Sequence, residues 1–197
     1  STLQLAGRFS HINFFDPYFT KPISTNHLKT DYKYSDLNLK FSSNLKNGDY
    51  FQFSSMYSND SYFESFEQSK DYGKSLDGIA SSNQFGISLK YVHNWIKGGN
   101  SNITISNSFY NNDLNSKITY WDSLYSAIYS LENWKNGITE TSSKITHHFS
   151  AQKKHQFTAS LGHIRSENYF SSSNNPFQLN TTSNSLDRLS MFMQDRI

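Results

Sequence analysis

Several features common in globular proteins are missing from this chain of 197 residues. It contains no cysteine and therefore no disulfide framework, as suits an envelope protein that needs none. No stretch approaches the roughly 20 consecutive apolar residues of a membrane helix. The net charge is only +2 and no basic run is interleaved with aromatic residues, so we expect no nucleic-acid partner. Ser1 to Gln4 have neither the charged nor the apolar region of a signal peptide, so any signal peptide is missing from this sequence.

The mean hydropathy of −0.69 is low for a protein with a large core, and by itself it would indicate disorder. Aromatic residues, however, make up 16% of the chain, whereas disordered chains are poor in them. A transmembrane β-barrel reconciles the two values, because only alternate residues of each strand have to be apolar while lumen, turns and loops stay polar.

Hydrophobic residues recur at every second position in eight segments, which is the period of a half-buried β-strand. Phe85, Ile87, Leu89 and Tyr91, for example, alternate with polar or small residues. Strands are predicted at Thr2–Phe14, Tyr34–Leu45, Phe51–Ser58, Phe85–Ile96, Asn102–Tyr110, Ile138–Phe149, His155–Ile164 and Leu186–Ile197. These lengths match the roughly 9 to 11 residues that a tilted strand needs to cross a bilayer.

The connections between these segments alternate between short and long. Tight turns are predicted at Lys46–Asp49, Lys97–Asn100 and Ala151–Lys154, and Asn47-Gly48 in the first is the strongest short-range hairpin signal. Long polar loops are predicted at Phe15–Thr30, Ser61–Ser82, Asn112–Leu131 and Ser166–Ser185. All three prolines lie in these loops, which supports the strand assignment. Outer-membrane barrels have this asymmetry, with short periplasmic turns and longer extracellular loops.

Two other architectures share the alternation. A soluble β-sandwich binding module also alternates apolar and polar residues, but its loops have no reason to sort by length. A barrel closed by these eight strands alone would serve as an adhesin, a defence factor or a membrane anchor. Its narrow lumen would hold an excess of positive charge with few partners. The residues predicted to face the lumen are Arg8, Asp36, Lys40, Lys90 and Lys144. A wide, hydrated or plugged lumen removes this difficulty and favours a larger barrel.

Short motifs along the chain resemble the barrel strands of TonB-dependent receptors from Bacteroidetes-type bacteria. Leu5–Asn13 resembles the family's early strand, which reads S-G-R-R-S-Y-L-D, and Asp36–Asp60 is similar to its D-L-N-x-K hairpin. Asn83–Asn94 is similar to the strand between W-G-N and R-W-N-H, and the terminal Met191–Ile197 resembles Y-x-x-D-E-I. The likeness covers nearly the whole chain in the family's order.

The resemblance implies an all-β fold in which residues 1–197 form about eight strands of a 22-stranded antiparallel barrel in a Gram-negative outer membrane. It implies that the plug domain, the TonB box and the remaining strands lie outside this sequence. The expected function is energy-coupled uptake of a scarce nutrient, such as a ferric chelate, a glycan or a peptide. The expected partners are outer-membrane lipid and lipopolysaccharide, the TonB–ExbB–ExbD complex, a surface lipoprotein and the nutrient.

Two of the predicted loops carry aromatic residues on the predicted extracellular side, where exposed aromatic residues often mark recognition surfaces. The candidate ligand-binding residues are Tyr62, Phe63, Phe66, Tyr120, Trp121 and Tyr125. The competing interpretation is that these rings pack the loops against one another.

No catalytic or cofactor-binding motif occurs in the chain, so we expect no enzyme activity, no catalytic residues and no cofactor. His147 and His148 are adjacent, so on a strand they point to opposite faces and cannot share a metal ion. Four other histidines are predicted to sit alone at strand ends: His11, His93, His155 and His163. An imidazole there suits the membrane interface, and we predict no metal site.

Overall fold

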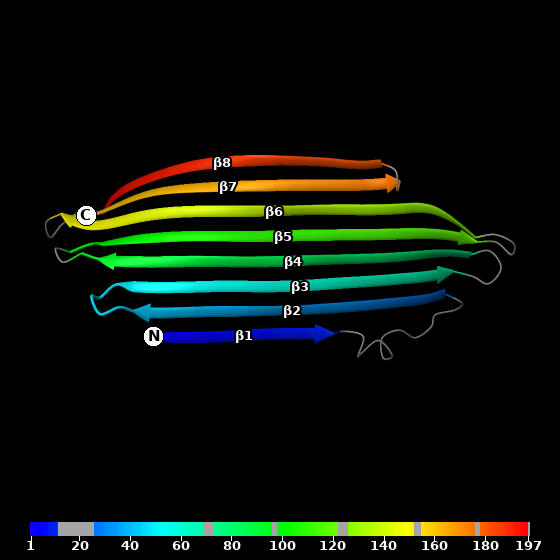
Figure 1. Cartoon of the computed structure of the whole chain (residues 1–197), viewed down its shortest axis with the longest axis horizontal. Coiled ribbons are helices and arrows are strands. Elements are labelled where there is room, and N and C mark those ends of the chain that lie inside the picture. The colour runs from blue at the N-terminus through cyan, green and yellow to red at the C-terminus, as the bar shows by residue number, and fades with distance from the viewer. Residues whose placement is uncertain are drawn as a thin grey trace.

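The chain forms one antiparallel β-sheet whose strands follow the order of the sequence (Figure 1). The computed structural model describes residues 1–11, 26–68, 73–95, 98–121, 126–151, 155–175 and 178–196. The strands are β1 (Thr2–His11), β2 (Asn26–Asn44), β3 (Tyr50–Gln68), β4 (Gly73–Asn94), β5 (Asn100–Trp121), β6 (Ser126–Ala151), β7 (His155–Asn175) and β8 (Gln178–Arg196). The predicted all-β antiparallel fold with eight strands is confirmed.

Most strands are about twice as long as the sequence predicts. Apart from β1, they contain 19 to 26 residues, so the long loops predicted at Ser61–Ser82, Asn112–Leu131 and Ser166–Ser185 are wrong over most of their length. Tyr62 on β3, for example, pairs with Ala80 on β4. The ladder continues because backbone pairing needs no apolar face once both faces are in water. Of the first predicted loop, residues 26–30 belong to β2, and residues 12–25 with Pro17 and Pro22 lie outside the described residues, as does Pro176.

Glycines with positive φ close the two tight turns that the structure describes. In the β2–β3 turn, Leu45 N donates to Asp49 O (2.8 Å), and Gly48 has a φ of 84°. In the β4–β5 turn, Trp95 N donates to Gly99 O (3.1 Å), and Gly98 and Gly99 have φ values of 83° and 118°. Residues with a Cβ rarely adopt such angles, so these hairpins depend on glycine. Both predicted turns are confirmed, and residues 152–154 of the third lie outside the described residues.

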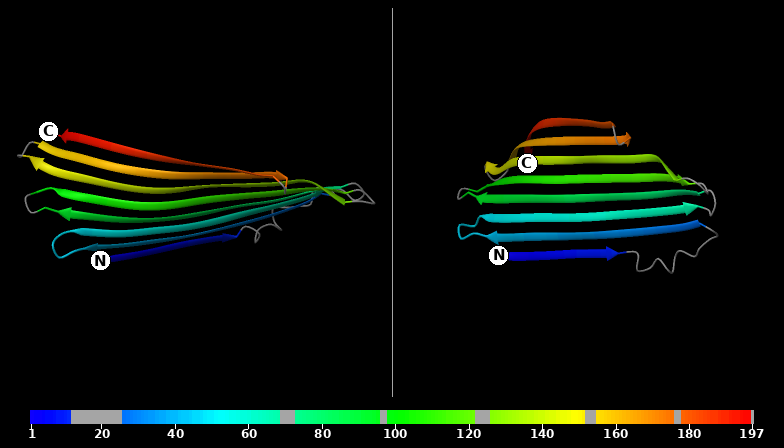
Figure 2. Two further views of the ribbon diagram at one scale, coloured as in Figure 1. Left: turned by 45° about the horizontal axis from the view of Figure 1, so that its top comes forward. Right: turned by 45° about the vertical axis from the view of Figure 1, so that its right-hand side comes forward.

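The sheet has no hydrophobic core. Among the described residues no hydrophobic side chain is buried, and all eight strands form a single layer (Figures 1 and 2). A sandwich would bury its inner faces between two sheets, so the β-sandwich alternative is wrong. β1 and β8 lie at opposite edges of the sheet and do not pair, so these eight strands form an open wall and not a closed small barrel.

Candidate functional site

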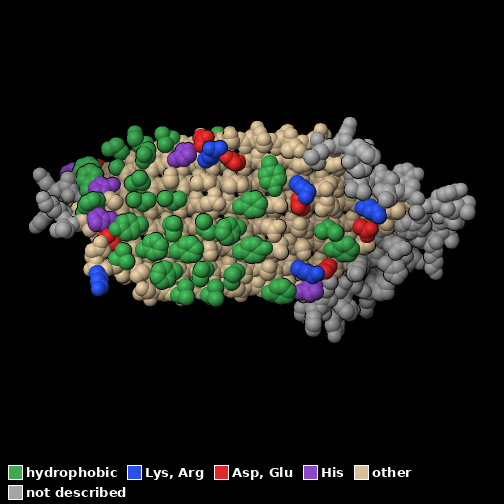
Figure 3. All heavy atoms as spheres, viewed as in Figure 1, with side chains coloured by type: hydrophobic (Ala, Val, Ile, Leu, Met, Phe, Trp, Pro, Cys, Tyr) green, Lys and Arg blue, Asp and Glu red, His purple; other side chains and the backbone are tan. Residues whose placement is uncertain are grey.

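The register separates the side chains into two faces of different character. Even-numbered residues share one face in all eight strands and odd-numbered residues share the other, apart from bulges near Ile118 and Ser172. Among the residues that the structure describes, twenty of the thirty exposed large hydrophobic residues have odd numbers and ten have even numbers. We call the odd-numbered face the apolar face and the other the polar face. Figure 3 shows hydrophobic side chains spread over the half of the sheet nearer the short turns.

The apolar face carries a belt whose height fits the hydrocarbon layer of a membrane. The belt runs from Trp95, directly after β4, to Phe85 on β4 through Tyr91, Leu89 and Ile87. Residues 85 to 95 span about 33 Å along a strand that rises ~3.3 Å per residue. With the usual tilt of roughly 40°, the vertical height is about 25 Å, as in outer-membrane barrels. The belt therefore fits contact with lipid.

The loop-side edge of the belt follows the register over half of the sheet. Leu37, Tyr57, Phe85 and Phe109 share one row across β2 to β5. On β6 and β7 the belt ends at Ile145 and Leu161, which pair with each other and lie six residues nearer the short turns than that row. The belt is therefore narrower on β6 and β7.

A buried carboxylate holds the turn side of this wall together. The side chain of Asp49, in the β2–β3 turn, is 0% exposed. It accepts hydrogen bonds from the Tyr91 hydroxyl (2.5 Å), the Asn94 backbone N–H (3.0 Å) and the Asn47 amide (2.7 Å), and His93 Nδ1 lies 2.9 Å away. The Tyr91 hydroxyl first, and then His93 and the backbone N–H, hold the pKa of Asp49 well below its usual range.

A line of aromatic and histidine rings continues from this carboxylate along the turn-side edge of the apolar face. The ring pairs, with centroid separations, are Tyr91–His93 (6.5 Å), His93–Trp95 (4.4 Å), Trp95–His147 (6.4 Å), His147–Phe149 (5.5 Å), Phe149–Phe157 (5.2 Å) and His155–Phe157 (5.9 Å). Rings with an apolar body and a polar tip suit the membrane interface. The line has the composition of one interfacial girdle.

The four histidines predicted to sit alone all have carboxylate partners, so that prediction is wrong. The pairs are His11–Asp31 (3.2 Å), His93–Asp49 (2.9 Å), His155–Asp195 (2.8 Å) and His163–Asp187 (3.1 Å). Each partner lies 20 to 44 positions away in the sequence and reaches its histidine only through strand pairing or a turn. Further ion pairs join Asp31 to Lys33 (3.3 Å) and Asp113 to Lys135 (3.5 Å) beyond the belt on the loop side.

The five predicted lumen residues all lie on the polar face. Arg8 and Asp36 are register partners, and the Arg8 guanidinium donates to the Asp36 carboxylate at 2.8 and 2.5 Å. Lys40, Lys90 and Lys144 form no ion pair with any described carboxylate. Lys90 and Lys144 share a register row, with Thr104 between them. The structure thus brings Arg8 and Asp36 together and spreads the lysines across the wall.

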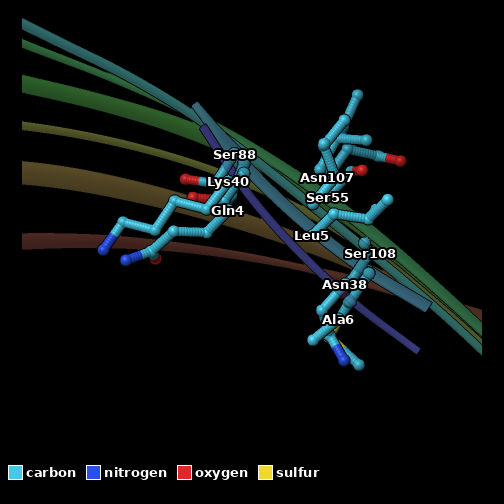
Figure 4. A pocket seen from close by; sticks show the side chains of 15 residues that line it. Gln4, Leu5, Ala6, Asn38, Lys40, Ser55, Ser88, Asn107 and Ser108 are labelled. Atoms are coloured by element: carbon cyan, nitrogen blue, oxygen red, sulfur yellow. The ribbon is translucent and has the colours of Figure 1, made fainter. Parts of the chain in front are cut away.

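A hollow of about 700 Å³ lies between two register rows of the polar face. Gln4, Lys40 and Ser88 belong to one row and Ala6, Asn38 and Ser108 to the other, and in Figure 4 they extend from the side of the sheet opposite to Leu5, Ser55 and Asn107. The hollow exists because serine, alanine and glycine occupy most of its floor. It is a shallow, open surface and not an enclosed site.

The candidate ligand-binding aromatic residues lie on strands and not in loops. Tyr62 and Phe63 are on β3 and face opposite sides of the sheet, so they cannot act as one surface. Phe66 is also on β3, while Tyr120 and Trp121 end β5. Tyr62 and Tyr120 are on the polar face and are about 40% exposed (39% and 41%). Tyr125 lies outside the described residues.

The sequence does not predict a contact between strands that is centred on Gly137. Tyr169 on β7 extends over Gly137 on β6 and donates a hydrogen bond from its hydroxyl to Asn111 on β5 (2.5 Å). A Cβ at position 137 would overlap the Tyr169 ring, so only glycine leaves room for it. The signal was the lone glycine inside a strand pattern, which often marks close approach of another group.

The described residues contain no group of three histidines or carboxylates close enough to hold a metal ion. Within the same ranges there is no helix of the length and hydrophobicity needed to cross a membrane.

Known proteins resemble this chain in structure but not in sequence. No family model matches it, and no curated protein sequence does. The siderophore receptor PiuA from Acinetobacter baumannii superposes with a TM-score of 0.55 at 8% identity, over 82% of this chain and 29% of PiuA. The ferric citrate transporter FecA gives a TM-score of 0.50 at 9% identity, over 86% of this chain and 25% of FecA. What they share with this chain is the fold.

Both neighbours are outer-membrane β-barrel receptors. This chain has the architecture of part of their barrel wall and spans under a third of the length of either protein. The predicted outer-membrane barrel fold is therefore confirmed as a fold. The Bacteroidetes-type origin that the motifs imply stays a prediction.

Proposed function

We propose that this chain is a section of the barrel wall of a TonB-dependent receptor in a Gram-negative outer membrane. The whole protein would bind a scarce nutrient on its extracellular side and pass it through the barrel with energy delivered by TonB, ExbB and ExbD. The polar face, with Arg8, Asp36, Lys40, Lys90 and Lys144, would line the lumen. The apolar face would contact phospholipid and lipopolysaccharide, and the missing plug and strands would complete the barrel.

One observation carries this proposal: a sheet without a core among its described residues has an apolar belt about 25 Å high on one face only. A soluble protein cannot leave twenty large hydrophobic side chains on one face in water without associating. The open edges at β1 and β8 support a larger barrel, because unpaired backbone groups in lipid cost several kcal/mol each. The likeness to PiuA and FecA supports the same architecture.

The test uses the full-length protein that contains this chain, purified from outer membranes. We expect it to need detergent for solubility and to migrate faster on a gel before heating than after heating. Uptake of its nutrient by cells should stop when TonB is deleted or when an uncoupler removes the proton-motive force.

Two results would contradict the proposal. Full solubility without detergent would exclude any membrane barrel. A mature polypeptide of about 22.8 kDa, the mass of this chain alone, would exclude a receptor of the proposed size. Nutrient uptake that persists without TonB would be compatible with a membrane barrel but would contradict the proposed energy coupling.

A further inference from the structure

The polar face carries a second set of exposed hydrophobic residues that contact with lipid does not explain. Ten of the thirty exposed large hydrophobic residues in the described ranges lie on this face, and all but Phe192 are level with Ala6 of β1 or nearer to the loops. They include Tyr62, Tyr110, Leu114, Trp134, Ile138 and Phe170. Because the lipid belt is on the opposite face, these side chains point away from the bilayer.

These residues form a continuous row and not a scatter. Tyr32, Tyr62, Ala80, Leu114 and Trp134 are consecutive register partners across β2 to β6. The next strand supplies Phe170, whose ring meets that of Trp134 edge to face with 5.8 Å between centroids. Trp134 and Phe170 remain 42% and 37% exposed, so their faces are open to a ligand.

Carboxylates border this row. Asp60, Glu64, Glu132 and Glu140 lie on the same face and in the same half of the sheet, and each is only partly exposed. The Tyr62 hydroxyl donates to Glu64 (2.9 Å), and Ser82 donates to Asp60 through its N–H (3.1 Å) and hydroxyl (2.5 Å). These hydrogen bonds hold the acids in place without neutralising them. This half of the polar face has two basic residues in the described strands: Arg8, which is bound to Asp36, and Lys74 on β4, so acidic residues remain in excess.

The turn-side half of the polar face has the opposite charge. Its charged residues in the described strands are Lys40, Lys90, Lys144, Arg188 and Arg196, and no described carboxylate accompanies them there. The acidic character is therefore confined to the half that carries the aromatic row.

We propose that this aromatic and acidic surface is a binding site for a ligand that combines cationic groups with a planar or apolar part. The inference rests on the proposed function and assigns a substrate class to the extracellular end of the lumen. Trp134, Tyr62 and Phe170 supply ring faces, which attract ammonium and guanidinium groups through their quadrupole. Glu64, Glu132 and their neighbours attract the same charges and repel an anionic ligand.

The experiment measures binding of two labelled peptides to the full-length protein in detergent micelles. One peptide contains a tryptophan and four lysines, and in the other four glutamates replace the lysines. The lysine peptide should bind more tightly, and its affinity should fall as salt is added. In a Glu64→Gln/Glu132→Gln variant its affinity should fall about fivefold, and in Trp134→Ala about threefold, as expected for partly exposed charge pairs and cation–π contacts.

The matched control is Glu167→Gln. Glu167 is a carboxylate in the loop-side half that lies on the apolar face and is bound to Arg165 (2.7 Å), so its loss should leave peptide binding unchanged. Equal binding of the two peptides, or native affinity in the double glutamate variant, would overturn the charge assignment. Native affinity in Trp134→Ala would overturn the aromatic part. Heat-modifiable migration of each variant shows separately whether the barrel has folded. A wrong ligand assignment is therefore distinguishable from failure of the proposed function.

Discussion

Single residues stabilise this wall through contacts between strands, since there is no core to do so. The clearest case is Gly137, whose missing side chain admits the Tyr169 ring and allows its hydrogen bond to Asn111. We expect Gly137→Ala to lower the free energy of unfolding by about 1–3 kcal/mol, the usual cost of overpacking. Urea unfolding in lipid vesicles measures this. Gly78→Ala is the control, because a Cβ there meets only one backbone oxygen at 4.0 Å, and an equal loss in both variants would contradict the explanation.

Asp49 makes a pH-dependent contribution at the turn side. Hydrogen bonds lower the pKa of this carboxyl on folding, so its stabilising effect is present above the ordinary pKa of about 4 and is lost as the pH falls through the lower native value. Asp49→Asn should therefore be less stable than the native protein at pH 7, and the difference should shrink below about pH 4. Urea midpoints at several pH values test this. The control is Asp187→Asn, which replaces an exposed carboxylate and should change the urea midpoint only slightly at every pH.

The sequence could not predict contacts of this kind. The partners of His93 and His163 lie 44 and 24 positions away, and nothing in the local pattern indicates which aspartate each histidine meets. Asn47-Gly48 and Gly98-Gly99, by contrast, fix their turns through local backbone preference, so they were predictable.

At the scale of the strand, the period of two is informative only where the two faces meet different surroundings. On β4 the alternation from Phe85 to Tyr91 coincides with the apolar belt on one face and polar or small residues on the other, and the sequence predicts this part of the strand correctly. Around Tyr62 and Ala80 both faces lie beyond the belt, so the alternation weakens and the paired strands there were predicted as a loop. Because the alternation is weak there, the sequence predicts Tyr62 in a loop and does not predict the row of register partners that Tyr62 shares with Trp134.

The difference between the faces predicts opposite effects for neighbouring substitutions on β5. Ile105 is in the apolar belt and is 51% exposed, whereas Ser106 faces the hollow on the polar face. Ile105→Arg should destabilise the folded barrel by about 2–4 kcal/mol, because it places a charge in the lipid. Ser106→Arg should be tolerated in a hydrated lumen. The fraction of heat-modifiable protein in outer membranes reports on both, and equal loss would show that the faces are assigned wrongly.

At the scale of the whole molecule, the wall places two of its three tryptophans in different surroundings. Trp95 is at the turn-side edge of the lipid belt, and Trp134 is on the polar face near the loop side. With all other tryptophans replaced by phenylalanine, Trp95 fluorescence should be quenched by brominated phospholipid and Trp134 fluorescence by aqueous acrylamide. Quenching of Trp134 by the lipid would contradict the proposed lumen.

The register, which is uninterrupted across the belt, also constrains how this protein can change over evolutionary time. Between the bulges near Ile118 and Ser172 and the short turns, every strand has its even-numbered residues on one side, so deleting one residue within the belt would exchange the two sides for the rest of that strand. Substitutions leave the register intact, and changes of length are harmless only at the ends of hairpins. We therefore expect related sequences to keep the number of residues across the belt constant and to confine their gaps to the hairpin ends.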